Sequence, residues 1–311
     1  MTKTPILRIG TRGSPLALVQ TNEVRDRLAA AHQDLAAPGA IEIVVIKTTG
    51  DKVLDRALSE VGGKGMFTKE IDEAMIGGSI DLAVHSMKDV PTWLPGGICL
   101  PCMLERQDPR DVFISNKAEN IAGLAARSVI GTASLRRRAQ ILNRRPDLRV
   151  EVLRGNVQTR LKKLEEGAVD ATLLALAGLR RLGMADLATT VIETDELLPA
   201  VGQGAIGVTC RSGDANSLDW LAAINHAPTK VCVDAERALL EVLDGSCRTP
   251  IGGLAEIGDD GEMSLRGMVA RPDGSEVIET ARQGPAKDAG AMGRDAGEEL
   301  KRRAGPGFFD V

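Results

Sequence analysis

Residues 131–160 read GTASLRRRAQILNRRPDLRVEVLRGNVQTR and hold eight arginines in thirty positions. Apolar residues recur between the arginines, a pattern typical of folded structure and not of a disordered basic run. Thr132 and Ser134 can cap a helix, because a hydroxyl oxygen accepts a bond from the free N–H groups of a first turn. Residues 150–153 then predict a strand, and Asn156 predicts the cap of a second helix.

Half of these arginines lie beside the predicted turns, namely Arg136, Arg137, Arg154 and Arg160. Helix starts expose backbone N–H groups and the positive end of the helix dipole, which favour anions. The planar guanidinium group also matches a carboxylate or phosphate two bonds at a time. We therefore expect an anion site here. The remaining arginines fit a solvated helix face better, namely Arg138, Arg144, Arg145 and Arg149.

The charge distribution favours a small polyanionic ligand over a nucleic acid. Residues 121–182 carry 13 Lys and Arg against 5 Asp and Glu, in a 311-residue chain whose net charge is −4. Aromatic residues make up only 2% and tyrosine is absent, which removes the stacking platform that single-strand binders use. We expect no nucleic-acid partner.

The composition predicts a cytoplasmic globular protein. The length suits two or three domains, and 43% hydrophobic with 26% charged residues is ordinary for such proteins. No signal peptide or membrane-spanning run is visible. Five cysteines and three histidines predict neither a disulfide framework nor a metal site. Cys99-Leu-Pro-Cys102 follows a Pro-Gly-Gly turn, so we expect no redox use, and Cys210 and Cys232 look like core residues.

The first half of the chain predicts two related α/β units. Strands are expected over 7–10, 41–48 and 80–84, and helices over 15–31 and 67–76. Ile9-Gly-Thr-Arg-Gly-Ser14 is similar to Ile130-Gly-Thr-Ala-Ser134, and Ser79-Ile-Asp81 is similar to Ala168-Val-Asp170. We expect parallel strand pairs with ligands beyond their carboxyl ends, in a cleft between two lobes.

A third unit of α+β type is expected at the C-terminus. The Gly-rich segment 198–205 could return the chain to the first unit. Helices over 229–243 and 286–303 flank strands over 251–257, 263–271 and 276–281, with hairpin turns at Asp260-Gly261 and Asp273-Gly274. The predicted domains are 1–104 with about 200–224, then 105–199, then 225–311.

Three single residues are candidates for chemistry, each with a structural alternative. Asp89 ends a strand and can stabilise a cation or move a proton, or it simply forms the turn. Cys247 lies in a Gly-Ser-Cys-Arg loop that favours nucleophilic use, while its alternative is a small buried hydrophobe. Lys64 lies in a segment that is either a lid over the ligand or a surface loop.

Seven motifs, together and in order, resemble the porphobilinogen deaminase (hydroxymethylbilane synthase) family of tetrapyrrole biosynthesis. They cover nearly the whole chain and read TRGSPLA at 11–17, VGGKG at 61–65, VHSMKDVP at 84–91, GTASLRR at 131–137, LRGN at 153–156, LPAVGQGA at 198–205 and GSC at 245–247.

The resemblance implies two α/β domains similar to the lobes of bilobal solute-binding proteins, and a smaller α+β domain with a three-stranded antiparallel sheet. It implies a transferase that joins four porphobilinogen molecules head to tail, with release of ammonia, onto an enzyme-bound dipyrromethane. Hydrolysis then releases hydroxymethylbilane. The dipyrromethane cofactor would be attached to Cys247 through a thioether. Each pyrrole brings an acetate and a propionate, which fits the many arginines.

The family's site residues carry over one by one. Asp89 matches the catalytic aspartate, and Lys64 lies in the lid. Cofactor-binding positions are Lys88, Asp89, Thr132, Ser134, Arg136, Arg137, Arg154 and Gly155. Substrate-binding positions are Arg12, Ser14, Arg154, Arg160 and Arg181.

Two positions depart from the family pattern. Glu60 stands where some bacterial members have Lys, so we assign no ligand contact there. Ala133 stands where Ser is common, which leaves Thr132 and Ser134 as the hydroxyl ligands of that turn. We expect a monomer without a membrane partner. The alternative function is a non-catalytic, two-lobed binding protein for a small polycarboxylate, which gives Cys247 no role.

Overall fold

The computed structural model describes residues 5–52, 65–244 and 249–309. By their contacts the described residues form two compact units. The first comprises described residues of 1–53, 63–107 and 205–230, and the second those of 108–204 and 231–311. The predicted division into three domains, with boundaries near 104, 199 and 224, stays a prediction.

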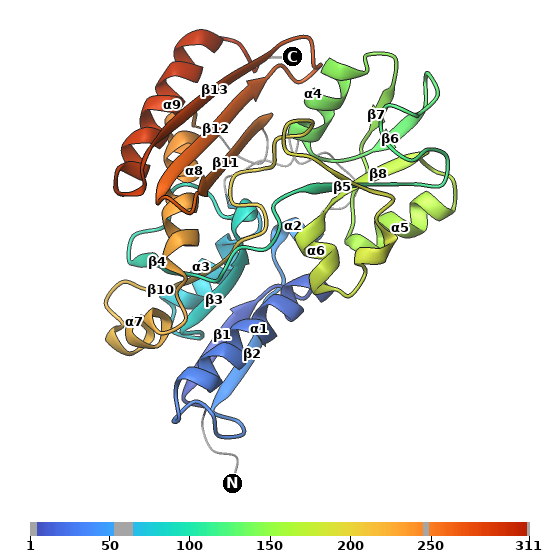
Figure 1. The fold of residues 1–311 in the computed structure, drawn as a ribbon. Coiled ribbons are helices and arrows are strands. Elements are labelled where there is room, and N and C mark those ends of the chain that lie inside the picture. Colours follow the sequence, from blue (N-terminus) through green and yellow to red (C-terminus); the bar gives the residue numbers. More distant parts are fainter. Residues whose placement is uncertain (1–4, 53–64, 245–248, 310–311) are drawn as a thin grey trace. The chain divides into compact units, whose positions relative to one another are not determined.

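The first unit contains a five-stranded mixed sheet in the order β2-β1-β3-β10-β4 (Figure 1). Its strands are β1 (Leu7–Thr11), β2 (Ile41–Val45), β3 (Leu82–Ser86), β4 (Ile98–Met103) and β10 (Ile206–Arg211). The predicted parallel pairing is confirmed for β1 with β2 and β3. β10 pairs antiparallel with both β3 and β4, so the segment after 198 does return the chain to this sheet.

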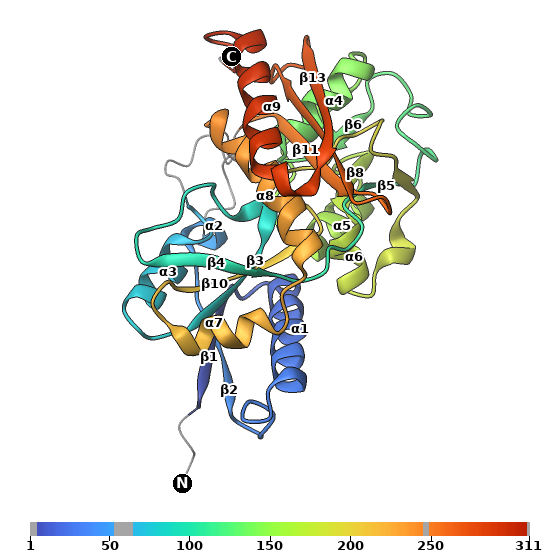
Figure 2. The same ribbon diagram turned by 60° about the vertical axis from the view of Figure 1, so that its left-hand side comes forward.

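Helices cover both faces of this sheet. α1 (Pro15–Ala31) and α7 (Ala215–Ala222) pack on one face through Val24, Leu28 and Leu221 (Figure 2). α3 (Lys69–Ile76) packs on the other face through Ile71 and Met75. The short helix α2 (Thr49–Lys52) and the 3-10 turn η1 (Met87–Asp89) follow β2 and β3.

The second unit repeats this sheet. Its strands are β5 (Asp111–Ser115), β6 (Val129–Gly131), β7 (Arg149–Glu151), β8 (Ala171–Ala175) and β9 (Thr190–Ile192). The order is β7-β6-β8-β5-β9, with parallel pairs around β6 and antiparallel pairs around β5. The helices are α4 (Leu135–Arg144), α5 (Val157–Glu165), α6 (Leu176–Arg181) and the 3-10 turn η2 (Ala185–Leu187). Strand order and direction therefore match the first sheet position by position.

The repeat extends to individual contacts. Asp81 accepts a hydrogen bond from the backbone N–H of Arg8 at 3.0 Å, and Asp170 accepts one from Val129 at 2.6 Å. In each case a carboxylate that precedes the third strand of the repeat fixes the first strand. These bonds explain why both units show an Asp at this point of the sequence.

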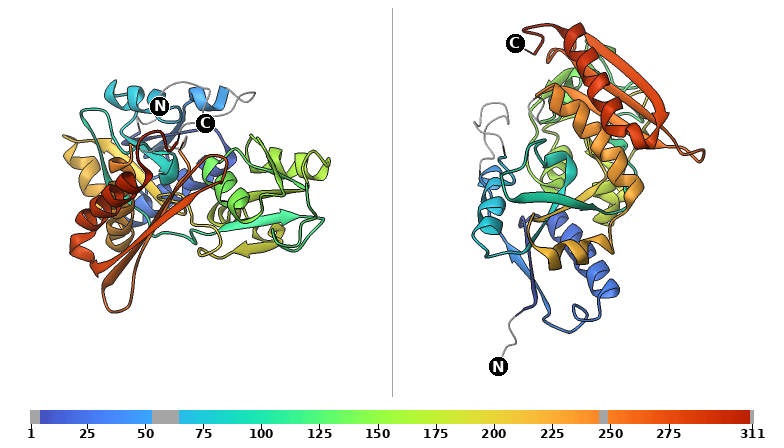
Figure 3. Two further views of the ribbon diagram at one scale, coloured as in Figure 1. Left: turned by 90° about the horizontal axis from the view of Figure 1, so that it is seen from above. Right: turned by 90° about the vertical axis from the view of Figure 1, so that its left-hand side faces the viewer.

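A three-stranded antiparallel sheet completes the second unit, as predicted. It is formed by β11 (Ile251–Ile257), β12 (Glu262–Ala270) and β13 (Val277–Pro285). Gly261 and Gly274 occupy the two hairpin turns with φ of 78° and 79°, a conformation that favours glycine. α8 (Ala227–Val242) and α9 (Ala289–Ala304) cover one face (Figure 3). The predicted last helix begins later than expected, since 286–288 forms the 3-10 turn η3 (Ala286–Asp288).

The other face of this small sheet packs against α4 within the same unit. Ala139 of α4 shares a core with Leu254, Met268 and Ala270. The carbonyl of Gly274 accepts a hydrogen bond from Asn143 Nδ2 at 2.9 Å. This packing explains why the second sheet and the three-stranded sheet form one compact unit.

Candidate active site

The first unit brings three predicted site residues to the carboxyl ends of β1 and β3. Arg12 follows β1, and Ser14 caps α1 by accepting a hydrogen bond from Ala17 N at 3.3 Å. Asp89 ends the turn that follows β3. Arg12 Nη1 lies 3.8 Å from Asp89 Oδ2, and the two side chains are 24% and 33% exposed. A carboxylate and a guanidinium group are thus paired where ligands of such sheets bind.

Phe67 is a residue that the sequence analysis did not single out. The guanidinium carbon of Arg12 lies 4.2 Å from the centre of the Phe67 ring, within the range of a cation–π contact. A Cβ atom at Gly50 would come within 2.2 Å of the same ring. Gly50 therefore lets the backbone approach the ring closely. A lone aromatic residue at a helix start gave no signal that it would meet Arg12.

Buried polar residues lie behind this pair. His85 is 7% exposed, and its Nε2 atom lies 3.0 Å from Thr209 Oγ1. Burial, with a smaller contribution from the charge of Arg12, lowers the pKa of His85 to about 4. The imidazole ring is therefore neutral at physiological pH. It does not act as an acid–base partner for Asp89 at that pH. Ser86 donates to Gln20 Oε1 at 3.0 Å, which ties β3 to α1.

The second unit gathers its predicted residues at the equivalent strand ends. Thr132 follows β6, where its Oγ1 accepts from Ser134 N at 3.2 Å, and Ser134 caps α4. Arg154 follows β7 and is 9% exposed. Arg181 ends α6, the helix after β8, and donates to the carbonyl of Gly204 at 3.1 Å. Thr132 and Arg154 thus follow the carboxyl ends of neighbouring parallel strands, and Arg181 lies one short helix beyond the third.

Arg136 and Arg137 are more deeply buried than the sequence predicts, at 4% and 5% exposed, and their anion is internal. Asp111, at 0% exposed, accepts from Arg136 Nη2 at 2.8 Å and from Arg137 Nη2 at 2.7 Å. Their Nη1 atoms donate to the carbonyls of Leu198 and Leu173. The Nε atoms of both arginines are buried and have no hydrogen-bond partner among the described residues.

The charges in this cluster compensate one another. Burial alone would raise the pKa of Asp111, but the charges and hydrogen bonds of Arg136 and Arg137 together outweigh it and hold this pKa well below its ordinary value. Gln203 Nε2 adds a third hydrogen bond to the same carboxylate at 2.8 Å. Asp111 is therefore ionised, and it fixes both guanidinium groups beneath the start of α4.

The turn at Arg154 is built around Gly155. Gly155 has φ of 119°, and a Cβ atom there would lie 2.7 Å from Thr159 Cγ2. Asn156 caps α5 as predicted, accepting from Thr159 N at 2.8 Å. Arg160 Nε donates to the carbonyl of Gly155 at 2.9 Å. Arg160 therefore supports the turn that carries Arg154.

Arg145 does not belong to a solvated helix face, contrary to the sequence-based expectation. It donates to the carbonyls of Ile121 and Leu124 at 2.9 Å and pairs with Asp147 at 2.7 Å. It holds the segment before β6 in place, a contact between distant residues that the helical pattern could not reveal. Lys64, Glu60 and Cys247 lie outside the described residues.

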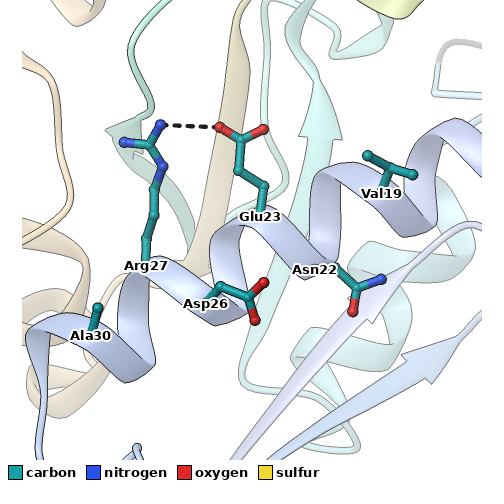
Figure 4. A pocket seen from close by; sticks show the side chains of 6 residues that line it. All are labelled: Val19, Asn22, Glu23, Asp26, Arg27 and Ala30. Carbon is teal, nitrogen blue, oxygen red and sulfur yellow. Dashed lines mark hydrogen bonds and ion pairs between the residues drawn. The ribbon is translucent and has the colours of Figure 1, made fainter. Parts of the chain in front are cut away.

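A hollow on the first unit is separate from these strand ends. It runs along the exposed side of α1 (Figure 4), where Glu23 and Arg27 form an ion pair at 3.1 Å. All of its lining residues come from that one helix: Val19, Asn22, Glu23, Asp26, Arg27 and Ala30. It contains none of the predicted site residues. Across the described part of the chain, no helix is long and apolar enough to span a membrane.

Fold and site together define an α/β protein with a duplicated five-stranded sheet, whose strand ends present arginines and a paired carboxylate suited to carboxylate-bearing ligands. Family models agree with this class. Residues 7–219 match "Porphobilinogen deaminase, dipyromethane cofactor binding domain", and residues 230–302 match "Porphobilinogen deaminase, C-terminal domain". The chain belongs to the porphobilinogen deaminase family.

Curated relatives support this assignment over nearly the full length. The chloroplastic porphobilinogen deaminase of Oryza sativa subsp. japonica is 59% identical over 99% of this chain and 87% of its own. The porphobilinogen deaminase of Nitrobacter hamburgensis is 57% identical over 97% and 95%. This chain is therefore an enzyme of tetrapyrrole synthesis that acts on porphobilinogen, and the alternative of a non-catalytic binding protein is not supported.

Solved structures of solute-binding proteins show a weaker likeness. A periplasmic substrate-binding protein from Coxiella burnetii is 14% identical, with a TM-score of 0.44, over 74% of this chain and 96% of its own. A methionine-binding protein is 11% identical with the same TM-score, over 70% and 89%. The fold assignment rests on the two sheets themselves and on the family.

The described residues fit the dipyrromethane cofactor that this family carries. Its acetate and propionate groups are anions, and the buried Nε–H groups of Arg136 and Arg137 are cationic donors still to be satisfied. Thr132 and Ser134 add hydroxyl groups at the same strand end. The chemistry of this donor set matches a polycarboxylate.

Proposed function

We propose that Asp89 is the catalytic carboxylate of this porphobilinogen deaminase. The observation that carries the proposal is the 3.8 Å pair of Arg12 and Asp89 at the ends of β1 and β3, with both side chains partly exposed. A carboxylate at this point can hold a proton at a pyrrole nitrogen and stabilise positive charge that develops on the substrate. Arg12 holds the carboxylate in place and binds a substrate carboxylate together with Ser14.

We further propose that the second unit holds the carboxylates of the cofactor and of the growing product. Its ligands in this unit are Thr132, Ser134, Arg136, Arg137, Arg154 and Gly155. Family resemblance suggests Lys88 as a further cofactor ligand. Arg160 and Arg181 bind substrate carboxylates. When bound, the dipyrromethane supplies the pyrrole carbon to which the first porphobilinogen is joined. We propose, by resemblance to the family, that the cofactor is attached through a thioether at Cys247 and that Lys64 belongs to a lid. The head-to-tail joining of four substrates is the family's reaction.

A substitution series at Asp89 tests the catalytic role. Asp89→Asn keeps the size of the side chain but removes the charge and the proton acceptor. Turnover should fall by a factor on the order of 10², with unchanged thermal unfolding. Asp89→Glu is the matched control, because it keeps a carboxylate and should retain more turnover than the Asn variant. Near-normal turnover of Asp89→Asn would contradict the assignment.

A further inference from the structure

β4 contains an extra residue relative to its neighbour β10. Val208 pairs with Cys102 and Cys210 pairs with Cys99, so Leu100 and Pro101 together lie opposite one residue of β10. Proline has no N–H to donate to a strand ladder, and it is tolerated on edge strands and at bulges. β4 is one of the two edge strands of this sheet. The bulge is therefore explained by Pro101.

The bulge turns the two cysteines of β4 toward the same core. In a regular strand, residues three apart point to opposite faces. Here Cys102 belongs to the core beneath α1, and Cys99 packs against that core together with Cys210. Both cysteines of the CxxC follow the Pro-Gly-Gly turn as expected, and both lie in β4. The closest thiol described for Cys99 lies on the neighbouring strand.

Cys99 and Cys210 are placed for covalent bonding. Their Sγ atoms lie 3.6 Å apart, and both thiols are free. Directly opposed residues of antiparallel strands have Cα atoms roughly 4.5–5.5 Å apart, within the roughly 4.4–6.8 Å that disulfides span. We propose that Cys99 and Cys210 are an oxidative modification site, at which a hydroperoxide closes a reversible cross-strand disulfide.

The reaction balances in two steps. Cys99, which is partly exposed, attacks the hydroperoxide O–O bond, giving a sulfenic acid and releasing water from hydrogen peroxide. The Cys210 sulfur then attacks the Cys99 sulfur and breaks its S–O bond, and the Cys210 proton leaves with the hydroxyl group as a second water. The two thiols lose two electrons, which reduce the peroxide. Burial raises the pKa of Cys210 to about 12, consistent with Cys99 reacting first.

The modification site is separate from the proposed catalytic residues. Cys210 pairs with Leu82 at the start of β3, whereas Ile206 pairs with Ser86 at its end. Four residues of strand span roughly 13 Å. The proposal therefore does not depend on the role assigned to Asp89, and its test uses chemical products and not turnover.

Peptide mapping of the holoenzyme tests the proposal. Trypsin leaves Cys99 and Cys102 on peptide 89–106 and Cys210 on peptide 182–211. After treatment with hydrogen peroxide and alkylation of the remaining thiols, these two peptides should appear as one cross-linked species. Dithiothreitol should separate them. A disulfide within peptide 89–106, or no cross-link while Cys99 is oxidised to sulfinic acid, overturns the proposal.

Three variants sharpen this test. Cys102→Ala is the matched control, because Cys102 is buried on the same strand, and it should keep the cross-link. Cys99→Ala and Cys210→Ala should both abolish it. In Cys210→Ala the Cys99 thiol, lacking its partner, should progress to sulfinic and sulfonic acid. A cross-link that survives in either variant, or equal over-oxidation of Cys99 in the parent enzyme, contradicts the assignment.

Discussion

At the scale of residues, Asp111 shows how a basic stretch becomes part of a folded core. It lies 25 and 26 positions before the two arginines that it binds, and its own side chain is fully buried. Arg136 and Arg137 therefore combine an internal ion pair with Nε–H groups that remain to be satisfied. The sequence could predict that these arginines would meet an anion. It could not predict Asp111, because an Asp at a strand start carries no signal of its partner.

Removing the Asp111 charge should destabilise the fold. Asp111→Asn leaves two buried guanidinium groups without their counterion, which typically costs about 3–5 kcal/mol of unfolding free energy. Chemical denaturation checks this at neutral pH. Asp147→Asn, which breaks the more exposed pair with Arg145, is the matched control and should change stability much less. Equal effects of the two substitutions would contradict a structural role for Asp111.

The same carboxylate makes a pH prediction. Folding lowers the pKa of Asp111. The stabilisation that its ionised carboxylate gives to the folded state is therefore fully present above the unfolded pKa of about 3.9. This stabilisation is lost progressively as pH falls below the unfolded value and through the folded value. The stability difference between the parent and Asp111→Asn should therefore stay constant from pH 5 to 8 and narrow below about pH 4. A difference that already narrows near pH 6 would point to another group.

His85 should weaken the fold at mildly acidic pH. Its pKa is about 4 in the folded state and about 6.5 when unfolded. The unfolded chain therefore binds the extra proton between these values. Neutral His85 makes its full contribution to the free energy of unfolding above pH 6.5. About 3 kcal/mol of this free energy is lost as pH falls toward 4. His85→Asn should flatten the stability profile in this window. If the unfolding free energy of His85→Asn changes with pH as steeply as that of the parent, other titrating groups dominate the pH dependence.

At the scale of elements, features set by neighbouring residues were more predictable from the sequence than contacts between distant segments. Ser134 and Asn156 cap their helices as expected, and Ser14 caps α1 in the same way, since capping depends on residues three positions apart. The duplication of an α/β unit was readable from repeated short motifs. The roles of Phe67 and Arg145 were not, because each depends on a contact with a segment distant in the sequence.

The turn before α5 offers a test of one element. Gly155→Ala forces a side chain into a backbone conformation with φ of 119° and into contact with Thr159. We expect a loss of about 1–3 kcal/mol, together with weaker binding at the adjacent Arg154. Gly167→Ala is the matched control: its φ is 74°, but no atom lies within 4 Å of the added Cβ. Gly167→Ala should lower stability less than Gly155→Ala does. Thermal unfolding of both variants checks this ranking.

At the scale of the whole molecule, the small net charge hides an uneven distribution of acidic and basic residues along the chain. Excess acidic residues keep the chain negative overall, while residues 121–182 concentrate the arginines on the second sheet and its helices. An enzyme whose product gains carboxylates with every added pyrrole needs such a local excess of cations. Charge counting predicted a small polyanionic ligand, and the family resemblance supplied the pyrrole carboxylates. The structure adds that part of the excess is neutralised internally by Asp111.

Intact mass of the whole chain tests the cofactor assignment. We predict that purified parent enzyme carries the added mass of one dipyrromethane, attached at Cys247, which lies outside the described residues. Cys247→Ala should show the bare polypeptide mass and no turnover. The described cysteines lie in β4, β10 and α8, so Ala variants at Cys99, Cys102, Cys210 and Cys232 serve as controls and should keep the adduct. An adduct that persists in Cys247→Ala, or active parent enzyme of bare mass, would place the attachment elsewhere.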